Sequence, residues 1–393
     1  MNNRVLNTEI QKFINDNLDS EITHLLLKGI SFEGVEAREI IEQIEAKKKC
    51  KSKLPTWFNS ENIYYPNKLN IEQTSSEITA QYKSQLISGH SIIDITGGFG
   101  GDSFYFSKQF KNVTHCEIDD ELSQIVKHNY KQLNANNINS FNVDGIVYLN
   151  KATETFDWIY TDPSRRHDTK GKVFFLKDCL PNIPKHLDLL FQHSNNVMIK
   201  TSPLLDISIG IGELKFVKSI HVIAVNNEVK ELLWVLENGF NKDISINTVN
   251  IKKDGLESFN FKLAKEQNAE VNYSLPLAYL YEPNSAVLKS GAFKNISKQF
   301  KISKLHQHSH LYTSDKPIDF PGRCFKIIEI LPYNKKAIRK VLGSKKANIS
   351  VRNFPETVNR IKSKFNIQDG GNLYVFFTTD FENERIAILS SKI

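Results

Sequence analysis

Short apolar segments separated by longer amphipathic stretches dominate the first half of the chain. They lie at 91–95, 113–117, 139–143, 156–161 and 196–201. This alternation is typical of βαβ units, in which a parallel sheet has both faces covered, and it predicts a helix over 174–190. The next two apolar segments, 219–225 and 229–237, are separated by three residues, which is too few for a crossover helix. We therefore expect them to pair as an antiparallel hairpin.

A different periodicity precedes this region. Over residues 1–48, apolar side chains recur at three- and four-residue steps, which predicts helices, and 35–47 is a second strong helix former. The lysine-rich run 47–53 is interpreted as a solvated helix end, where the helix dipole favours positive charge. The stretch 71–88 also has a helical pattern.

The C-terminal part has a mixed pattern. The segments 244–252 and 258–264 alternate as strands do, and 274–290 is interpreted as a loop that leads into a helix. From residue 323 the pattern is strand, helix, strand, helix, strand and strand. This order predicts a small α+β unit.

Composition limits the protein class. The chain has 393 residues, of which 40% are hydrophobic and 24% charged, as in folded globular proteins of two to four domains. No apolar run approaches the roughly 20 residues that cross a bilayer, and the N-terminus lacks the apolar core of a secretory signal. The four cysteines lie far apart without a CxxC pair, so neither disulfides nor a structural zinc site is expected. These features predict a cytoplasmic protein.

The net charge of +7 is unevenly distributed. Residues 291–393 contain 19 Lys and Arg against 8 Asp and Glu, whereas the preceding 290 residues contain 32 and 36. The excess positive charge therefore lies entirely in the C-terminal quarter. Such an asymmetry favours a polyanionic partner, above all nucleic acid, although an unevenly charged solubilising surface would look the same.

The segment 94–102 is the main candidate for ligand chemistry. It directly follows a predicted buried strand and contains Asp94, Thr96, Gly97, Gly98, Gly100 and Asp102. Glycines let the backbone turn sharply and approach a ligand closely. A dinucleotide fingerprint would need a third glycine where Ser103 stands. Two carboxylates would repel a pyrophosphate but attract an ammonium or a sulfonium, which favours S-adenosylmethionine over a dinucleotide. A glycine turn that serves packing alone is the third interpretation.

Acidic residues also follow the next two strands. Glu117 and Ile118 end the second strand, where a carboxylate can accept both ribose hydroxyls, and Asp144 and Gly145 follow the third, where an adenine amine could be bound. Either acid alone is typical of a turn or a helix cap. Because successive parallel strands end at one edge of the sheet, their joint placement favours a ligand site.

These residues carry a resemblance to a known family. The stretch 91–237 resembles a class I S-adenosylmethionine-dependent methyltransferase. The phrases LPTW (54–57), EQTSSEITAQYK (72–83), DITGGFGGDS (94–103), DPSRR (162–166) and IKTSPLLDI (199–207) resemble a bacterial methyltransferase family with a ferredoxin-like region and a C-terminal THUMP-like domain.

The resemblance implies the fold and its division. It implies an α/β fold with a Rossmann-like methyltransferase sheet, whose parallel strands are closed by an antiparallel hairpin, together with an N-terminal helical domain and C-terminal α+β domains. The expected regions are a helical domain at 1–75, the methyltransferase domain at 76–240, a ferredoxin-like region at 241–322 and a THUMP-like domain at 323–393.

The fourth strand is expected to end at the acceptor site. There the resemblance implies a catalytic role for Asp162, Pro163, Ser164 and Arg165. Methylation of an exocyclic base amine is disfavoured, because Ser164 and Arg165 stand where amino-methylating relatives carry a proline and an aromatic residue. Methylation at C5 of a pyrimidine is disfavoured as well. It needs a cysteine nucleophile after the proline, whereas Cys116 and Cys179 fall on a predicted strand and helix.

Further candidates surround this site. Arg166 could hold a phosphate or carboxylate of the substrate, and Lys200 and Ser202 end the fifth strand at the same edge. In related methyltransferases the segment before the first strand folds over the cofactor, which would place Gln73 and Ser76 near its methionine part. Helix capping is the alternative role for Ser75 or Ser76.

The basic C-terminal quarter completes the prediction. Its substrate-binding candidates are Lys335, Lys336, Arg339 and Lys340. With the THUMP resemblance, they favour RNA (tRNA or rRNA) as the partner. Methylation of a protein or small molecule, and a non-catalytic RNA-binding adaptor, are the alternatives. No metal is expected, since the HQHSH run at 306–310 lacks acidic or cysteine residues at ligand spacing. The sequence leaves the oligomeric state open and is compatible with a monomer.

Overall fold

The computed structural model describes residues 1–165 and 174–393, which form two compact units. The first contains Met1–Val217 and Trp234–Phe240, and the second contains Lys218–Leu233 and Asn241–Ile393.

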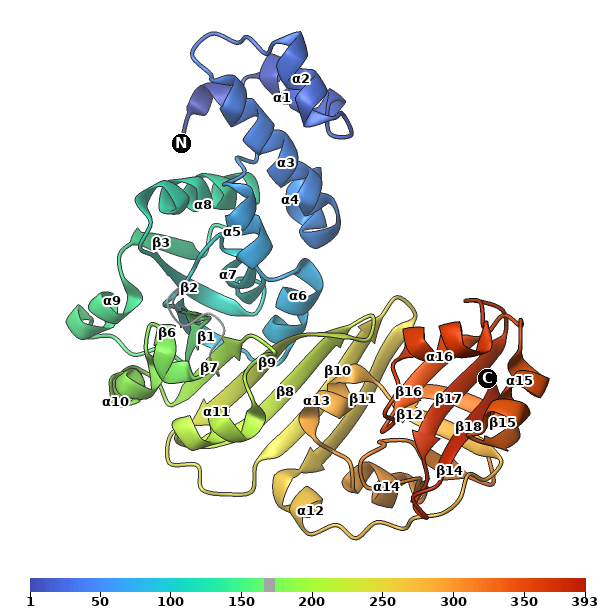
Figure 1. Cartoon of the computed structure of the whole chain (residues 1–393). Coiled ribbons are helices and arrows are strands. Elements are labelled where there is room, and N and C mark those ends of the chain that lie inside the picture. The colour runs from blue at the N-terminus through green and yellow to red at the C-terminus, as the bar shows by residue number, and fades with distance from the viewer. Residues whose placement is uncertain (166–173) are drawn as a thin grey trace. The chain divides into compact units, whose positions relative to one another are not determined.

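Helices form the N-terminal part of the first unit (Figure 1). They are η1 (Asn3–Leu6), α1 (Thr8–Asp16), α2 (Ile22–Lys28), α3 (Ala37–Lys53), α4 (Pro55–Asn59), α5 (Lys68–Gln73) and α6 (Glu77–Gln85). The helices predicted over residues 1–48 are confirmed, and α3 continues through the whole lysine-rich run 47–53. Their apolar faces share one core with the helices beside the sheet. In this core the ring of Trp57 lies 4.8 Å from that of Phe104.

The stretch 71–88, predicted as one helix, is instead broken at Thr74–Ser76. Ser76 has extended backbone angles, and its hydroxyl accepts a hydrogen bond from the Thr79 N–H at the start of α6. A serine in this role ends one helix and begins the next, because it satisfies an N–H that has no partner within the helix.

A parallel sheet forms the centre of the first unit. Its strands are β1 (Gly89–Asp94), β2 (Phe110–Glu117), β3 (Ile138–Asn142), β4 (Trp158–Thr161) and β7 (Asn196–Thr201), in the order β7-β4-β1-β2-β3. All four neighbouring pairs are parallel, as predicted. The helices between them are α7 (Gly101–Phe106), α8 (Asp120–Gln132), α9 (Gly145–Lys151), α10 (Ile183–His193) and α11 (Ile207–Glu213). The carboxyl ends of these strands therefore meet at one edge.

The helix predicted over 174–190 is wrong in its first half. A 3₁₀ turn, η3 (Leu176–Asp178), is followed by the short strand β6 (Cys179–Leu180), which pairs with β5 (Ser164–Arg165). The helix α10 begins only at Ile183, because Pro181 cannot donate a helical hydrogen bond and Asn182 caps the new helix through the Lys185 N–H. Cys179 thus lies on a strand and not on a helix.

The second unit contains the predicted hairpin. The strands β8 (Val217–Val225) and β9 (Glu228–Glu237) are neighbours, joined by Asn226 and Asn227, whose φ angles are both positive, as a type I′ hairpin turn requires. Residues 234–237 of β9 belong to the first unit, where the strand is the neighbour of β7. Next to β8 lies β10 (Ser245–Lys252), parallel to it, and then the antiparallel β11 (Gly255–Lys262), followed by α12 (Leu263–Gln267).

A separate seven-stranded sheet forms the C-terminal part of the second unit. Its order is β13-β14-β12-β15-β18-β17-β16. The strands are β12 (Tyr279–Pro283), β13 (Ser303–Lys304), β14 (Tyr312–Ser314), β15 (Gly322–Pro332), β16 (Asn348–Arg352), β17 (Leu373–Thr379) and β18 (Arg385–Lys392). The helices are α13 (Ser285–Ser290), α14 (Asn295–Phe300), α15 (Lys335–Leu342) and α16 (Val358–Phe365).

The order of elements predicted from residue 323 onward is confirmed. The prediction for 274–290 missed β12, which is fixed by pairing with β14 and β15, segments distant in sequence. The HQHSH run lies in turns, where His306 Nδ1 accepts from the His308 N–H at 3.0 Å. Within residues 1–165 and 174–393, no group of three or more His, Cys, Asp or Glu is placed to hold a metal ion. No helix of the described residues is long and apolar enough to cross a membrane.

Candidate functional site

The loop from β1 to α7 needs glycine at several positions. Gly98 and Gly100 have φ angles of 55° and 81°, which favour glycine. A β-carbon on Gly97 would lie 2.2 Å from the Nε2 of His115, and one on Gly100 would lie 2.1 Å from the hydroxyl oxygen of Tyr130. The loop is thus folded tightly onto β2 and α8.

Asp94 holds this loop from within. Its side chain is 1% exposed, Oδ1 accepts from the Thr96 N–H at 3.1 Å, and Oδ2 accepts from the Ser103 hydroxyl at 2.7 Å. Burial raises the pKa of this carboxyl to about 7, against the two hydrogen bonds that lower it. Ser103, which takes the place of the third glycine of a dinucleotide motif, therefore has a defined partner. A contact between Asp94 and a cofactor stays a prediction.

Asp102, at the start of α7, takes part in a buried network. Lys83 of α6, with a fully buried side chain, lies 3.0 Å from Oδ1 and also donates to the Ser75 hydroxyl at 2.8 Å. Oδ2 accepts from the Ser75 and Tyr160 hydroxyls at 2.8 and 2.6 Å. Burial alone would raise the pKa of Asp102, but Lys83 and Lys200 outweigh it and lower this pKa.

Sequence reasoning missed Lys83 and Tyr160. Within α6, the buried positions Thr79, Ala80 and Lys83 recur at helical spacing, so a lysine on the inward face was the available signal. Ser75, and not Ser76, meets the glycine-loop side of the site, while Ser76 caps α6. Gln73 is exposed at the end of α5. For Gln73 and Ser76, contact with a cofactor stays a prediction.

Glu117 and Asp144 lie at the ends of the next two strands, as the sequence predicts. Glu117 Oε2 accepts from the Gly98 N–H and Oε1 from the Asp119 N–H, both at 2.8 Å, and burial raises its pKa. Asp144 caps α9, with Oδ1 accepting from two N–H groups at 2.8 and 3.0 Å. Each carboxylate oxygen can accept more than one hydrogen bond, so these contacts leave capacity for a ligand.

One close approach and one exposed side chain characterise the region around these strand ends. A β-carbon on Gly145 would lie 2.3 Å from the Ile95 carbonyl oxygen, so glycine allows α9 to approach the end of β1 closely. The side chain of Ile118, between the two acidic positions in sequence, is 70% exposed. A large aliphatic side chain with that exposure beside carboxylates is suited to covering the flat face of a purine.

The acceptor candidates follow β4. The Asp162 N–H donates to the Thr96 hydroxyl at 2.6 Å, which ties this strand end to the glycine loop. The Asp162 carboxylate forms an ion pair with Lys200 from the end of β7. Pro163 is buried and Ser164 exposed. Asp162 and Lys200 thus form one charged pair, although the sequence placed Lys200 only among the secondary candidates.

The remaining acceptor candidates are Ser202, Arg165 and Arg166. Ser202 is exposed, and its hydroxyl accepts from the Leu204 N–H at 3.3 Å. The backbone of Arg165 pairs with Cys179, and Arg166 lies outside the described residues.

The cysteine positions disfavour a thiolate mechanism. Cys116 is 1% exposed on β2, and burial raises its pKa to about 12. Cys179 is fully buried on β6. A nucleophilic cysteine needs access and a lowered pKa, and these environments are the opposite.

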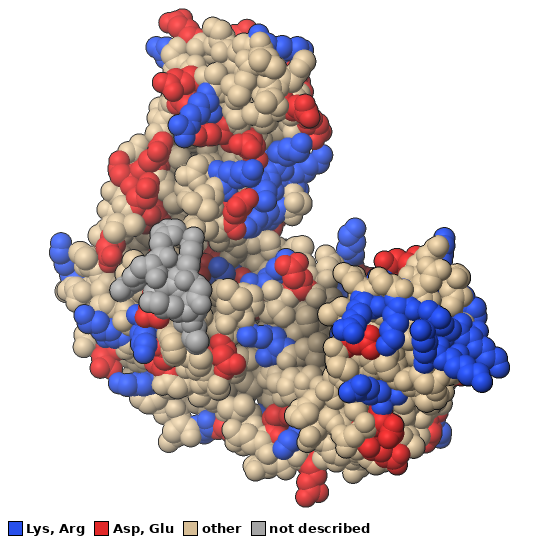
Figure 2. Space-filling view, in the orientation of Figure 1, with Lys and Arg blue, Asp and Glu red and all other residues tan. Residues whose placement is uncertain are grey.

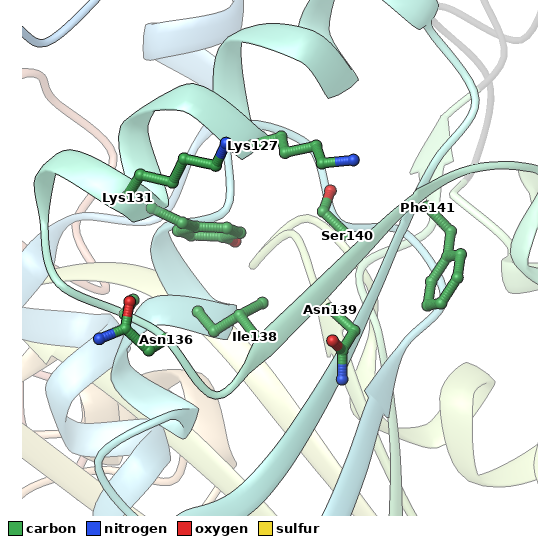
Figure 3. A pocket seen from close by; sticks show the side chains of 9 residues that line it. Lys127, Lys131, Asn136, Ile138, Asn139, Ser140 and Phe141 are labelled. Atoms are coloured by element: carbon green, nitrogen blue, oxygen red, sulfur yellow. The ribbon is translucent and has the colours of Figure 1, made fainter.

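A separate cavity of about 380 Å³ lies beside α8 and the edge strand β3 (Figure 3). It is lined by two lysines of α8, Lys127 and Lys131, by Asn136 and Asn139, and by Phe141. No carboxylate of the candidate site lines it. Its amide and ammonium groups do not match an adenosine with a positively charged sulfur, so the strand ends stay the candidate site for such a ligand.

Comparison with known proteins agrees with this architecture. Family models for a ferredoxin-like domain and a THUMP domain-like region match residues 279–321 and 322–392. A protein of Porphyromonas gingivalis W83, described as a putative methyltransferase, is 29% identical and superposes with a TM-score of 0.89, covering 99% of this chain and 98% of its own. No curated protein matches the sequence.

Other solved structures cover less of the chain. A putative methyltransferase of Streptococcus mutans in complex with S-adenosylhomocysteine (14% identity, TM-score 0.31) covers 41% of this chain and 96% of its own. The tRNA m1G37 methyltransferase of M. jannaschii (13%, 0.30) covers 43% and 51%. Both scores are too low to support an argument. The chain therefore has, over its whole length, the fold of the Porphyromonas protein, and it carries a ferredoxin-like and a THUMP-like domain.

Proposed function

We propose that this protein is an S-adenosylmethionine-dependent methyltransferase that modifies RNA, tRNA or rRNA, in the cytoplasm. The observation that carries the proposal is the meeting of three acidic strand ends, at Asp94, Glu117 and Asp144, around a loop that requires glycine. The similarity of the whole chain to a protein described as a methyltransferase supports it.

The residues present fit S-adenosylmethionine. Glu117 is the candidate for the ribose hydroxyls, Ile118 and Asp144 for the adenine, and the glycine loop for the methionine part. A buried acid at the loop, Asp94, with a pKa of about 7, suits a ligand that carries positive charge. When bound, the cofactor supplies an already activated methyl group.

The chain itself would then align the acceptor. Asp162 is fixed at two points, by its N–H to Thr96 and by its carboxylate to Lys200. Holding the accepting atom in line with the methyl carbon is the main contribution that such a site can make to the rate. The ion pair orients Asp162 as a positioning group or an acceptor for a substrate proton.

The RNA assignment rests on the second unit. Lys335, Lys336, Arg339 and Lys340 are exposed on α15, and within the described residues none of them pairs with a carboxylate. Figure 2 shows Lys and Arg gathered over α15 and α16. Cations without partners attract phosphates, and a THUMP-like domain is expected to recognise the RNA backbone.

Two measurements test this proposal. Calorimetry should detect S-adenosylmethionine binding to the wild type and a large loss of affinity in Glu117→Ala, with Glu121→Ala, an exposed acid of α8, as the control. Transfer of a labelled methyl group to total RNA and to total protein of a strain lacking the gene should then label RNA. Absence of cofactor binding would refute the methyltransferase assignment, and label on protein alone would refute the RNA substrate.

A further inference from the structure

The lysine-rich end of α3 has two flanks with different surroundings. At 100° per residue, Lys49 and Lys53 lie on one flank, while Lys48 and Lys51 lie on the other. The buried side chain of Cys50 lies between them. On one flank Lys48 pairs with Asp19 at 3.3 Å, whereas the flank of Lys49 and Lys53 contacts α5. There Lys49 pairs with the Glu72 carboxylate at 3.1 Å, and Lys53 donates to the Glu72 carbonyl at 2.6 Å.

This flank adjoins the candidate site. Leu54, the C-cap of α3, and Thr74, two residues after Glu72, have side-chain atoms 3.8 and 3.1 Å from where a β-carbon on Gly101 would lie. Gly101 begins α7 directly after the glycine loop. The end of α3 is therefore held next to the loop, within the first unit.

Three lysines, Lys49, Lys53 and Lys200, interact electrostatically near the end of α3. The pKa of Lys53 is lowered to about 8, first by burial and then by repulsion from Lys200 and Lys49. The nearby carboxylates are already engaged, since Glu72 pairs with Lys49 and Asp162 with Lys200. An anion placed among the three lysines would relieve this repulsion. The Lys49 side chain is 46% exposed, so an anion in solution can reach it, and Figure 2 shows Lys and Arg gathered at the end of α3.

We propose that Lys49, Lys53 and Lys200 bind a backbone phosphate of the substrate RNA and so hold the strand beside the acceptor site. This inference rests on the proposed function and adds a contact in the first unit, separate from the basic surface of the THUMP-like domain. Such a contact fixes the register of the strand without reading its sequence. Lys49 and Lys53 therefore act as positioning residues for the methyl transfer.

The experiment compares two double variants of the full chain with equal charge change on one helix. Affinity for unfractionated bacterial tRNA is measured as a function of salt. Because each neutralised phosphate contributes about 0.7 to 0.9 to the slope of log K against log salt, loss of this one contact in K49Q/K53Q should lower the slope by about 0.7 to 0.9. K48Q/K51Q, on the opposite flank, should leave it unchanged. K49R/K53R, which keeps the charge, should retain the wild-type slope.

The outcomes separate this inference from the proposed function. Calorimetry with S-adenosylmethionine should give wild-type affinity for all three variants, which also shows that they fold. Equal slopes for K49Q/K53Q and K48Q/K51Q, in a protein that still methylates RNA, would overturn the inference alone. A wild type that binds no tRNA, or that transfers the methyl group only to protein, would overturn both.

Discussion

The buried ion pair between Lys83 and Asp102 predicts a large loss of stability in Lys83→Met. The change removes the cation 3.0 Å from Asp102 and leaves a carboxylate that is almost fully buried, with the Ser75 and Tyr160 hydroxyls as remaining partners. Removing one partner of a buried pair costs about 3–5 kcal/mol, because the other charge stays unpaired in a medium of low dielectric constant. We expect a loss of that size in the free energy of unfolding at neutral pH.

The loss should shrink in acid. In the wild type, the pKa of Asp102 is lowered on folding, so its contribution is present above the unfolded pKa of about 3.9 and is lost as pH falls through the folded value. In Lys83→Met burial dominates and raises the folded pKa, so protonation relieves the penalty as pH falls toward 4. Wild type and variant should therefore converge between pH 7 and pH 4.5.

Denaturation by urea, followed by tryptophan fluorescence, measures this effect. Trp57 is fully buried 4.8 Å from the ring of Phe104 on α7, so it reports on this region. Lys68→Met removes one partner of an exposed pair with Glu45 and should cost no more than about 1 kcal/mol. The double variant K83M/D102N should recover most of the loss. A single variant within about 1 kcal/mol of the wild type, with no dependence on pH, would refute this reasoning.

Three further predictions concern the loop and the acceptor site. Burial raises the folded pKa of Asp94 to about 7, so affinity for S-adenosylmethionine, measured by calorimetry, should rise between pH 6 and 8 in the wild type and stay flat in Asp94→Asn. The same dependence of affinity on pH in both proteins would contradict this. Gly97→Ala should destabilise by about 1–3 kcal/mol and weaken cofactor binding, because its β-carbon would meet His115 at 2.2 Å. Gly98→Ala, whose β-carbon would meet only the Thr96 carbonyl oxygen at an ordinary 3.9 Å, should cost about 1–2 kcal/mol through its positive φ. Equal melting temperatures for the wild type and Gly97→Ala would argue against the clash. Lys200→Met should lower the rate of methyl transfer about 100-fold with unchanged cofactor affinity, and an unchanged rate would exclude a role for its pair with Asp162.

The sequence by itself predicted the main parallel strands, the hairpin that follows them and the order of elements after residue 323, and it placed acidic residues at the strand ends. Alternating apolar segments are enough to predict parallel strands, because burial on both faces of a sheet requires them, and the residues that follow such strands must meet at one edge. The strand ends that carry Asp94, Glu117, Asp144 and Asp162 could therefore be predicted to meet at one edge without coordinates. The tight hairpin at Asn226 and Asn227 follows equally from a connection too short for any other geometry.

The tertiary structure alone decided which partner each side chain takes. Lys83 lies 19 residues before Asp102 in sequence, yet the packing of α6 against α7 joins them, so the acid predicted to attract the cofactor's charge is already neutralised by a lysine. In the same way, Lys200 reaches Asp162 because β7 is the neighbour of β4. Strand β12 and the break before α10 depend on long-range pairing and on local capping, which compete with periodicity. Periodicity indicates which face of an element is buried, but not which side chains pack against that face. The chemistry of the candidate site depends on those packing partners.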